Sequence, residues 1–426
     1  MAEQHGKTLV PEIRFSGFTD PWEQRKLGGI ATFGGGHTPS MSDSDNYEGG
    51  NVLWVTSQDV KSHYLDGTTT QITEKGAKEL TLYPAGSLVM VTRSGILRHT
   101  LPVAELRKPS TVNQDIRVIL PQEKYYGQWL LQFFISRNKE LLLEFGKTGT
   151  TVESVDFSKM RDMVLLTPSL PEQQRIGHYF ARLDNLITLH QRKYDKLCVL
   201  KKSMLDKMFP KGGSLYPEIR FSGFTDPWEQ RKLGELYQKN DERNTDGLGS
   251  ERTLSVASMT FNSTGNGADE SSLPSYKRLR LGDIAFEGHA NKEFAYGRFV
   301  LNDAGNGIMS PRFTCLRPIV EQEYSFWKYF IHSEEVMRPI LVNSTKSGTM
   351  MNELVVKDFL EQEILVPSLP EQRQIGAFFD CLDSLITLHQ RKYDGCTLSP
   401  TFLERCTLCR KTSPRNRCSA TTTPSG

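Results

Sequence analysis

A long internal repeat constrains this chain more than any other feature. Residues 11–28 read PEIRFSGFTDPWEQRKLG, and residues 217–234 repeat all eighteen letters. The motifs PSLPEQ and ITLHQRKYD also occur twice, once in each half of the chain. Solenoid proteins repeat every ~20–50 residues, because each of their units is too small to fold alone. A period of roughly 200 residues instead predicts two domains that share one scaffold.

The segments between the repeated motifs have diverged. Residues 30–145 and residues 235–345 share no comparable run of sequence. In the first segment, β-rich runs bounded by Gly, Pro and Asn predict strands at 87–92 and 115–120. An apolar run predicts a helix at 126–145. Each half is therefore predicted to have an α+β fold.

Heptad spacing predicts a long helix after each PSLPEQ motif. In the first copy, apolar, His and Tyr residues alternate at intervals of four and three from Ile176 to Met208, with one interruption at Lys201. A helix of about 38 residues would be roughly 57 Å long. The second copy begins with the same pattern. We expect the two helices to pair antiparallel.

The second of these helices is expected to be about 12 to 14 residues shorter, roughly 20 Å. Gly395 weakens a helix, and Pro400 ends one by steric clash and a missing N–H, so we expect the heptad seam to stop after Tyr393. Three apolar residues of the first helix would then lack a partner in this chain: Leu197, Met204 and Met208.

Composition sets looser bounds. The chain has 426 residues and a formal net charge of +2, so any binding to nucleic acid must use local basic patches or partner proteins. It has no apolar run of about 18 residues and no signal-peptide pattern at its start. The seven cysteines are an odd number, and four crowd into the last 31 residues, which argues against a disulfide framework. We expect a cytoplasmic protein.

At this point the motifs resemble a known family, the specificity subunits of type I restriction–modification systems. The resemblance covers residues 11–394 and is most specific in FxGFTDPWEQRKLG, which opens each half, and in SLPEQQRIG and LDNLITLHQRK, which close the first. The GGGHTPS run ending at Ser40, followed by VLWVTS ending at Ser57, is similar to the family's opening loop and strand. The family pattern is GGTPS, so His37 is an insertion.

The resemblance implies two target-recognition domains joined by long antiparallel coiled-coil-like helices in a pseudo-twofold repeat. Each domain would read one half of a split DNA site, and the helices would set the spacing between the halves. The implied domains are these: target-recognition domain 1 at 1–170, a central spacer helix and linker at 171–213, target-recognition domain 2 at 214–369, a distal spacer helix at 370–395, and a divergent, disordered tail at 396–426.

The resemblance also implies partners. Two methyltransferase (modification) subunits would dock on the helices, and restriction/translocase subunits would join the complex with double-stranded DNA. Adenine methylation and DNA cleavage belong to those partners in this family. S-adenosylmethionine, ATP and Mg are accordingly expected on the partner subunits, and no cofactor or metal on this chain.

The sequence independently lacks catalytic motifs. It has no Asn-Pro-Pro-aromatic run, which an amino-methyltransferase would need, and no GxGxxG after a predicted strand. Gly146-Lys-Thr imitates the end of a phosphate-binding loop, but Leu141 occupies the required earlier glycine position. Gly146 is better explained as the end of the preceding helix. These absences favour a non-catalytic chain.

Candidate base-reading side chains are those that present paired donors and acceptors to the major groove. Any one of them is more often a solvated surface residue. In the variable segments they are Arg93, Arg98, Asn113, Gln114, His289, Asn291, Lys292, Arg298 and Arg312. The family's opening loop and strand add Ser40 and Ser57.

A second set of candidates lies in two short loops that match at an offset of 199 residues, KTGTT at 147–151 and KSGT at 346–349. Lysine, hydroxyl and glycine residues together can contact the phosphate backbone, and recurrence in both halves fits a role independent of base sequence. A tight turn in the shared scaffold explains the same residues equally well. The candidates are Lys147, Thr148, Thr150, Lys346 and Thr349.

The remaining signals have structural explanations. His190 and His389 fall on the heptad seam, where packing or a polar pairing that fixes the register is favoured over metal binding. Trp22 and Trp228 lie in the repeated opener and are expected to anchor the scaffold. Cys406 and Cys409 form a single CxxC pair in the tail, too little for a structural zinc site. A shifted reading frame or a recombination junction explains the tail's departure from the first copy better.

The leading hypothesis is therefore a DNA-recognition subunit that reads a split asymmetric site. The rival from another class is a self-sufficient modification or cleavage enzyme, which the missing motifs count against. The third hypothesis is a scaffold or inactive variant of such a subunit, whose assembly is impaired by the aberrant C-terminal tail. Co-expression with a candidate methyltransferase subunit would separate these three, because the chain alone should not methylate DNA and the complex should.

Overall fold

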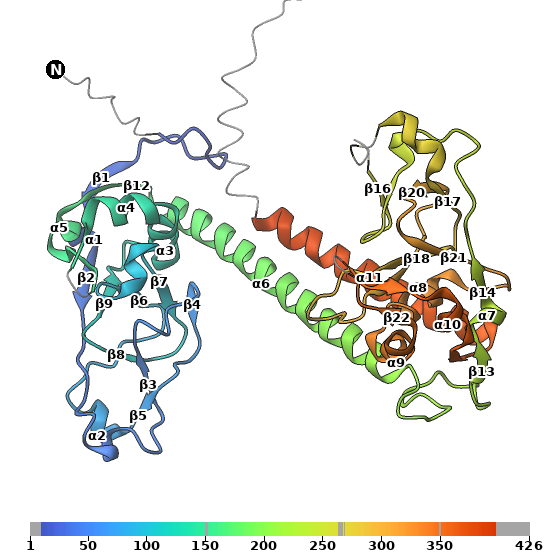
Figure 1. The fold of residues 1–426 in the computed structure, drawn as a ribbon. Helices are drawn as coiled ribbons and strands as arrows, with labels where there is room; N and C mark the ends of the chain where they lie inside the picture. Colours follow the sequence, from blue (N-terminus) through green and yellow to red (C-terminus); the bar gives the residue numbers. More distant parts are fainter. Residues whose placement is uncertain (1–9, 150–151, 263–266, 268, 349–350, 398–426) are drawn as a thin grey trace, which may run out of the picture. The chain divides into compact units, whose positions relative to one another are not determined.

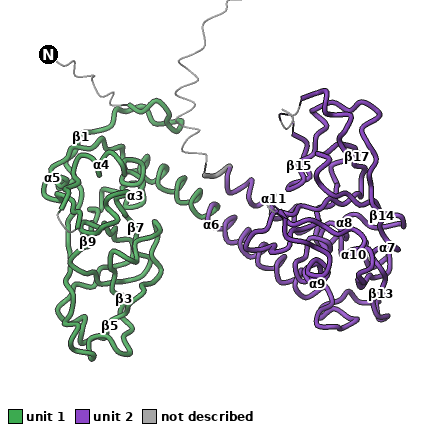
Figure 2. Tube along the Cα trace, in the orientation of Figure 1, with its two compact units in different colours: residues 1–186 green, residues 187–426 purple. Residues whose placement is uncertain are grey.

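The computed structural model describes residues 10–149, 152–262, 267, 269–348 and 351–397. By their contacts the residues fall into two compact units, residues 1–186 and residues 187–426 (Figures 1 and 2). Unit 1 and unit 2 are described separately below.

Unit 1 is organised around a five-stranded sheet of order β2-β9-β6-β7-β4. The strands are β2 (Ala31–Gly34), β9 (Ile116–Pro121), β6 (Leu88–Val91), β7 (Val103–Leu106) and β4 (Tyr64–Leu65). A three-stranded sheet of order β5-β3-β8 contains β5 (Gln71–Ile72), β3 (Val52–Val55) and β8 (Thr111–Val112). The strands predicted at 87–92 and 115–120 are thereby confirmed as β6 and β9.

Helices cover one end of unit 1, while β3, β5 and α2 (Glu74–Ala77) lie at the other end (Figure 1). The helices are α1 (Leu27–Ile30), α3 (Gly127–Ser136), α4 (Asn138–Phe145) and α5 (Phe157–Asp162). The single helix predicted at 126–145 is therefore wrong in one respect, because it breaks at Arg137. The Asn138 side chain accepts hydrogen bonds from Thr100 Oγ1 and Leu101 N, at 3.0 and 2.9 Å, and so begins a new helix against that loop.

Unit 2 repeats this architecture with different residues. Its four-stranded sheet has the order β14-β21-β18-β19, the counterpart of β2-β9-β6-β7. These strands are β14 (Tyr237–Lys239), β21 (Thr314–Pro318), β18 (Ile284–Glu287) and β19 (Arg298–Leu301). Smaller sheets pair β15 (Leu254–Ser255) with β16 (Thr260–Phe261) and β17 (Lys277–Leu279) with β20 (Gly307–Met309). The helices are α7 (Leu233–Leu236), α8 (Tyr324–Phe330), α9 (Glu334–Ser344) and α10 (Val356–Glu361).

The repeated motifs form the same scaffold in both units. Strand β1 (Glu23–Lys26) pairs with β12 (Val164–Thr167), and β13 (Glu229–Lys232) pairs with β24 (Glu363–Val366). The arginine of each PEIRF motif holds the buried glutamate of the nearby PSLPEQ motif by two hydrogen bonds. Arg14 Nε and Nη2 lie 2.6 and 2.7 Å from the Glu172 carboxylate, and Arg220 lies 2.7 and 2.8 Å from Glu371. The repeat thus specifies one scaffold twice.

The long helices follow the heptad prediction. Helix α6 runs over Leu170–Lys207, 38 residues, and α11 over Leu369–Thr397, 29 residues. His190 Nδ1 lies 3.0 Å from His389 Nδ1, and Lys201 Nζ lies 2.5 Å from Asp383 Oδ1. Residue numbers rise along α6 while their partners' numbers fall, so the helices are antiparallel. The histidines act as a polar pairing between the helices, as expected.

Two expectations about these helices are wrong. Helix α11 continues through Gly395 to Thr397, where the described residues end, so it is at most nine residues shorter than α6 and not 12 to 14. Leu197, Met204 and Met208 do not lack partners: Met208 is buried, and the other two pack against the core of unit 2. The reason is the antiparallel arrangement, which places the end of α6 beside the start of α11 rather than beside its end.

Candidate nucleic-acid interface

Several candidate residues of unit 1 meet in the loops at one end of the central strands of its main sheet. We call this end of the strands the sheet edge, or the reading edge. Strands β6 and β9 are antiparallel, with Val91 opposite Ile116, so β6 ends where β9 begins. Arg93 follows the end of β6, and Gln114 precedes the start of β9; both side chains are exposed. Thr92 N donates to the Asp115 carbonyl oxygen at 2.8 Å, which fixes the two loops to each other.

The glycine-rich loop packs against the same edge. At Gly36 a Cβ atom would lie 1.8 Å from the Val112 carbonyl oxygen, so only glycine fits this close approach. Thr38 Oγ1 donates to Gln114 Oε1 at 2.6 Å. Ser40 is exposed and its hydroxyl lies 2.9 Å from that of Ser42. The inserted His37 does not prevent the loop from reaching Gln114.

The KTGTT loop joins this edge as well. It connects β10 (Gly146–Lys147) to β11 (Ser154–Val155), and Val155 N donates to the Thr92 carbonyl oxygen at 2.9 Å. Lys147 Nζ lies 2.8 Å from Asp156 Oδ2, and this hydrogen bond holds the pKa of Asp156 below its usual value. Lys147 therefore has a structural partner, although its side chain remains 60% exposed.

A cavity of about 610 Å³ lies beside this loop. Lys147, Thr148 and Arg98 line it together with Lys139 and Glu153. Arg98 Nε donates to Glu153 Oε1 at 2.5 Å, which lowers the pKa of Glu153. A phosphate group could approach Lys139 and Lys147 while the ion pair between Arg98 and Glu153 stays intact. Lys139 and Glu153 were not among the candidates predicted from the sequence.

Unit 2 gathers its candidates at the corresponding edge. His289, Asn291 and Lys292 lie in the connection between β18 and β19, and all three are exposed. The second KSGT loop, between β22 (Thr345–Lys346) and β23 (Glu353–Leu354), meets that connection, since Asn352 N donates to the Gly288 carbonyl oxygen at 2.9 Å. Lys346 is exposed in this loop.

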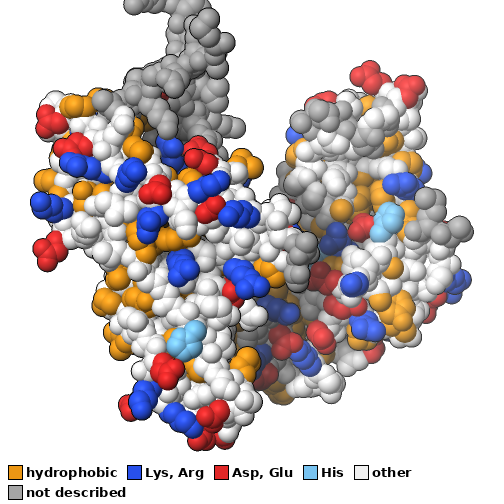
Figure 3. Space-filling model, turned by 90° about the vertical axis from the view of Figure 1, so that its left-hand side faces the viewer, with side chains coloured by type: hydrophobic (Ala, Val, Ile, Leu, Met, Phe, Trp, Pro, Cys, Tyr) orange, Lys and Arg blue, Asp and Glu red, His pale blue; other side chains and the backbone are white. Residues whose placement is uncertain are grey.

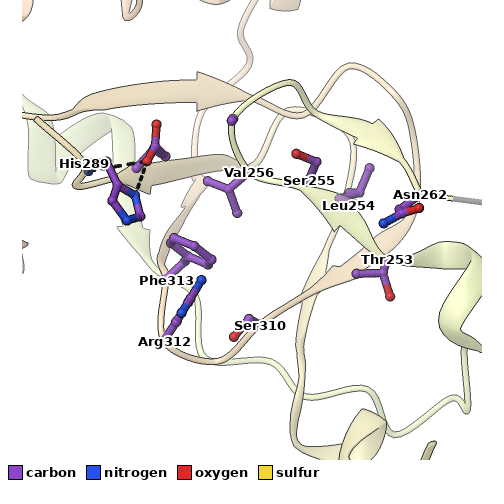
Figure 4. A pocket seen from close by; sticks show the side chains of 11 residues that line it. Thr253, Leu254, Ser255, Val256, Asn262, His289, Ser310, Arg312 and Phe313 are labelled. Carbon is purple, nitrogen blue, oxygen red and sulfur yellow. Dashed lines mark hydrogen bonds and ion pairs between the residues drawn. The ribbon is translucent and has the colours of Figure 1, made fainter. Parts of the chain in front are cut away.

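A pocket of about 530 Å³ opens beside the end of β18 (Figure 4). Arg312 and Phe313 form one wall, with the Arg312 guanidinium carbon 4.8 Å from the centre of the Phe313 ring. His289 Nδ1 lies 2.5 Å from Glu287 Oε1 at another wall. The pocket therefore combines a planar cation on an aromatic ring with a carboxylate and an imidazole, groups that can bind the edge of a base.

Glu287 was not among the sequence candidates, and it organises this pocket. Besides His289 it faces Arg298, whose Nε lies 3.4 Å from Glu287 Oε2. Arg298 also donates from Nη2 to the Ala257 carbonyl oxygen at 3.2 Å. Its side chain is 21% exposed, so Arg298 positions the carboxylate more than it reaches outward. The side chains predicted by residue type to read bases were all basic side chains or amides, although an acidic residue can also accept a hydrogen bond from cytosine.

Other candidates are held by the protein itself. Asn113 is buried, and its amide oxygen accepts from Asp115 N at 3.0 Å. Asn291 Oδ1 accepts from the backbone N–H groups of Glu293 and Phe294, both at 2.8 Å. Both asparagines therefore shape a loop. Ser57 is half-buried after β3, and Thr150 and Thr349 lie outside the described residues.

The charge on unit 1 is mixed. On the face shown in Figure 3, Lys and Arg side chains alternate with Asp and Glu side chains over the surface. Basic and acidic side chains are thus interspersed on this face, in agreement with the net charge of +2. Within the described ranges, no cluster of three or more metal-binding side chains occurs, and no helix is long and apolar enough to cross a membrane.

These features define a duplicated α+β protein, with one polar sheet edge in each unit. The chain belongs to the type I restriction modification DNA specificity domain family, whose model matches residues 19–198 and 225–395. The S subunit of a type I restriction–modification system from M. genitalium has a similar fold, with a TM-score of 0.54 at 12% identity; the match covers 96% of this chain and 100% of that one.

Curated relatives carry corresponding names. The EcoR124I/EcoR124II specificity subunit of Escherichia coli is 31% identical over 186 residues, 41% of this chain and 46% of that protein. The MjaIX specificity subunit of Methanocaldococcus jannaschii is 25% identical over 247 residues, 55% of this chain and 56% of that protein. The chain thus matches about half the length of these two. The MjaVIII subunit of the same archaeon is 22% identical over 418 residues, 92% of this chain and 90% of that protein.

Proposed function

We propose that this chain is the DNA-recognition subunit of a type I restriction–modification complex and reads a split, asymmetric DNA site. The observation that carries the proposal is the paired sheet edge: equivalent loops of two units with the same strand order present different polar side chains. Membership of the specificity-domain family supports the assignment to DNA.

The difference between the edges is the reason to expect an asymmetric site. In unit 1 the exposed candidates include Arg93 and Gln114, whereas in unit 2 they include His289, Lys292 and Arg312. Base pairs are distinguished by the pattern of donors and acceptors that each side chain presents. Two readers that presented the same side chains would be needed for a palindromic site.

The KTGTT and KSGT loops would supply contacts with the DNA backbone. Both adjoin the reading edge, through Val155 in unit 1 and Asn352 in unit 2. Phosphate contacts orient a protein on DNA without reading its sequence, which suits residues that recur in both units. Because the chain is nearly neutral, binding by the isolated chain should be weak and strongly dependent on salt.

The long helices would dock the methyltransferase subunits. The two copies of the LITLHQRK motif expose the same leucines: Leu186 and Leu189 are 39% and 45% exposed, and Leu385 and Leu388 are 38% and 44% exposed. Exposed apolar patches of this kind mark sites of protein contact. Two equivalent patches fit two methyltransferase subunits, to which restriction/translocase subunits would add.

The chain would not catalyse either reaction itself. Methylation and cleavage would reside in the cytoplasmic partners, with S-adenosylmethionine, ATP and Mg bound there. The test is to purify the chain and a methyltransferase subunit, separately and together, and to measure adenine methylation of DNA. Methylation only by the mixture, at one split motif, is the expected result. Methylation by the chain alone would overturn the proposal.

A further inference from the structure

The two units differ in how their aromatic clusters are closed. In unit 2 the end of α6 inserts Phe209 among the rings of Trp228, Phe330 and Phe379, with centroid distances of 6.5, 5.1 and 6.2 Å. Met208 and Phe209 are both about 2% exposed. The C-terminal end of α6 and the two residues that follow it therefore complete the core of unit 2.

The counterparts of these rings in unit 1 can be assigned from the repeat and from shared contacts. Trp22 and Phe180 occupy the same motif positions as Trp228 and Phe379. For the third ring, Gln132 Nε2 donates to Asp184 at 3.1 Å, as the Tyr329 hydroxyl donates to the equivalent Asp383 at 2.6 Å. The residues that follow, Phe133 and Phe330, are therefore equivalent.

These three residues of unit 1 are less buried than their counterparts. Trp22, Phe133 and Phe180 are all half-buried, whereas Trp228, Phe330 and Phe379 are at most 2% exposed. We call the three unit 1 residues, together with Leu183, the unit 1 socket. Leu183 is also half-buried, and its counterpart Leu382 is buried.

The indole N–H of Trp22 is a second, independent indication that the unit 1 socket is less complete than the equivalent site in unit 2. Trp228 Nε1 donates to Glu371 Oε1 at 3.3 Å in unit 2. Trp22 Nε1 is buried, yet it has no hydrogen-bond partner within the described part of the chain, although Glu172 is held by Arg14 just as Glu371 is held by Arg220. A buried donor without a partner costs free energy, so the surroundings of Trp22 are less complete than those of Trp228.

The sequence shows what would close the socket. In unit 2, Lys201 also contributes: it reaches Asp383, and its Nζ lies 4.9 Å from the centre of the Tyr329 ring. The pattern of Lys followed seven and eight residues later by Met and Phe occurs once in the 426 residues, at Lys201, Met208 and Phe209. At the offset of 199 residues, the second copy has Pro400, Thr407 and Leu408 instead.

We propose that the unit 1 socket binds a helix end supplied by a different polypeptide, which carries the Lys, Met and Phe of residues 201–209 in the same spacing. A second copy of this chain is not the proposed partner, because its own Met208 and Phe209 are buried in unit 2. The Phe would insert beside Phe133 and Phe180, and the Lys would lie at Asp184. This interaction is separate from DNA recognition, because none of the socket residues is a candidate for base or phosphate contact.

The test uses the full chain and a fluorescent synthetic peptide with the sequence of residues 194–210, in which Cys198→Ser prevents oxidation. One peptide should bind per chain, measured by fluorescence anisotropy. Because aromatic anchors dominate such interfaces, a Phe209→Ala peptide should bind at least roughly tenfold more weakly. Phe133→Ala in the chain should weaken binding as much, with folding checked by circular dichroism.

Leu143→Ala is the matched control, since Leu143 is 87% exposed in unit 1 and lies outside the socket. It should leave peptide binding unchanged. Failure of the peptide to bind, or equal binding of the Phe209→Ala peptide, would overturn the proposal. So would dimers of the chain that the peptide dissociates, because they would assign the socket to a second copy. None of these readouts depends on DNA.

Discussion

Unit 1 and unit 2 share a scaffold and differ in what the scaffold carries. The repeated motifs give the same strand pairing and the same buried arginine–glutamate pair in both units. The variable segments give the same order of four strands from unrelated sequence. The comparison teaches that unrelated sequences can form the same order of strands while the loops at one edge carry different polar side chains.

Exchanging a variable segment should have the largest effect on this comparison. Replacing residues 30–145 with the equivalent segment of another family member should change one half of the methylated motif completely and leave the other half intact. The reason is that all reading candidates of unit 1 lie within that segment or in the loop beside it. Sequencing of methylated DNA would measure this. A change in both halves would show that the units do not read independently.

Removing one ring from each unit should test the difference in core packing. Phe330→Ala in unit 2 should lower the free energy of unfolding by about 3–5 kcal/mol, because the ring is fully buried. Phe133→Ala in unit 1 should cost only about half as much, since that ring is half-buried. Urea unfolding of the full chain measures both. Equal losses would contradict an open socket in unit 1.

Arg312 should act on base reading in one half-site only. Its guanidinium lies exposed on Phe313 at the pocket of unit 2, and loss of a bidentate base contact costs about 1–3 kcal/mol. Arg312→Ala should therefore weaken binding and relax the sequence preference at one position of one half-site. Selection from a random DNA library measures the preference. Asn113→Ala is not a suitable control, since Asn113 is buried.

Lys147→Ala should have a smaller effect on DNA affinity, and this effect should be the same for all DNA sequences. A phosphate contact contributes to affinity mainly through release of counterions, so Lys147→Ala should reduce the slope of binding against salt by about one. Lys346→Ala is the matched change in unit 2. The measurement is a titration at several salt concentrations with target and non-target DNA. A changed sequence preference with an unchanged slope would make these lysines base readers.

The histidine pair should produce the smallest effect, on pH dependence. Partial burial, and then the charges of His190 and Lys193, lower the pKa of His389 below its usual value of 6.5. The unfolded chain therefore binds more protons near that pH, so the contribution to stability is present above pH 6.5 and is lost as the pH falls. The melting temperature should drop between pH 7.5 and pH 5.5, and less so in His389→Gln. An identical drop in that variant would remove the histidine pair from the explanation.

Much of the scaffold could be predicted from sequence because its signals are local. The heptads predicted α6, and β-rich runs predicted β6 and β9, since burial on one face sets a period that a single segment reveals. The break at Arg137 could not be predicted, because it depends on the contact of Asn138 with a loop 37 residues away. The partners of Met208 were missed for a related reason. In an antiparallel pair the end of α6 lies beside the start of α11, and the prediction compared it with the end of α11 instead.

The candidate site was predicted in part. Residue type and repetition predicted Arg312 and Lys147, both of which lie at the reading edges. The same reasoning could not separate them from Asn113 and Asn291, whose amides stabilise loops through contacts that only the folded chain shows. It also omitted Glu287, because a carboxylate looks unfavourable for DNA until His289 and Arg298 are seen beside it.

The most direct test of DNA recognition by two different edges is to map methylated adenines in a host that expresses this chain with a methyltransferase subunit. The expected result is one motif with two unlike halves separated by a spacer of unspecified bases. It should vanish when this chain is omitted. A palindromic motif, or methylation that is the same without this chain, would contradict recognition by two unlike sheet edges.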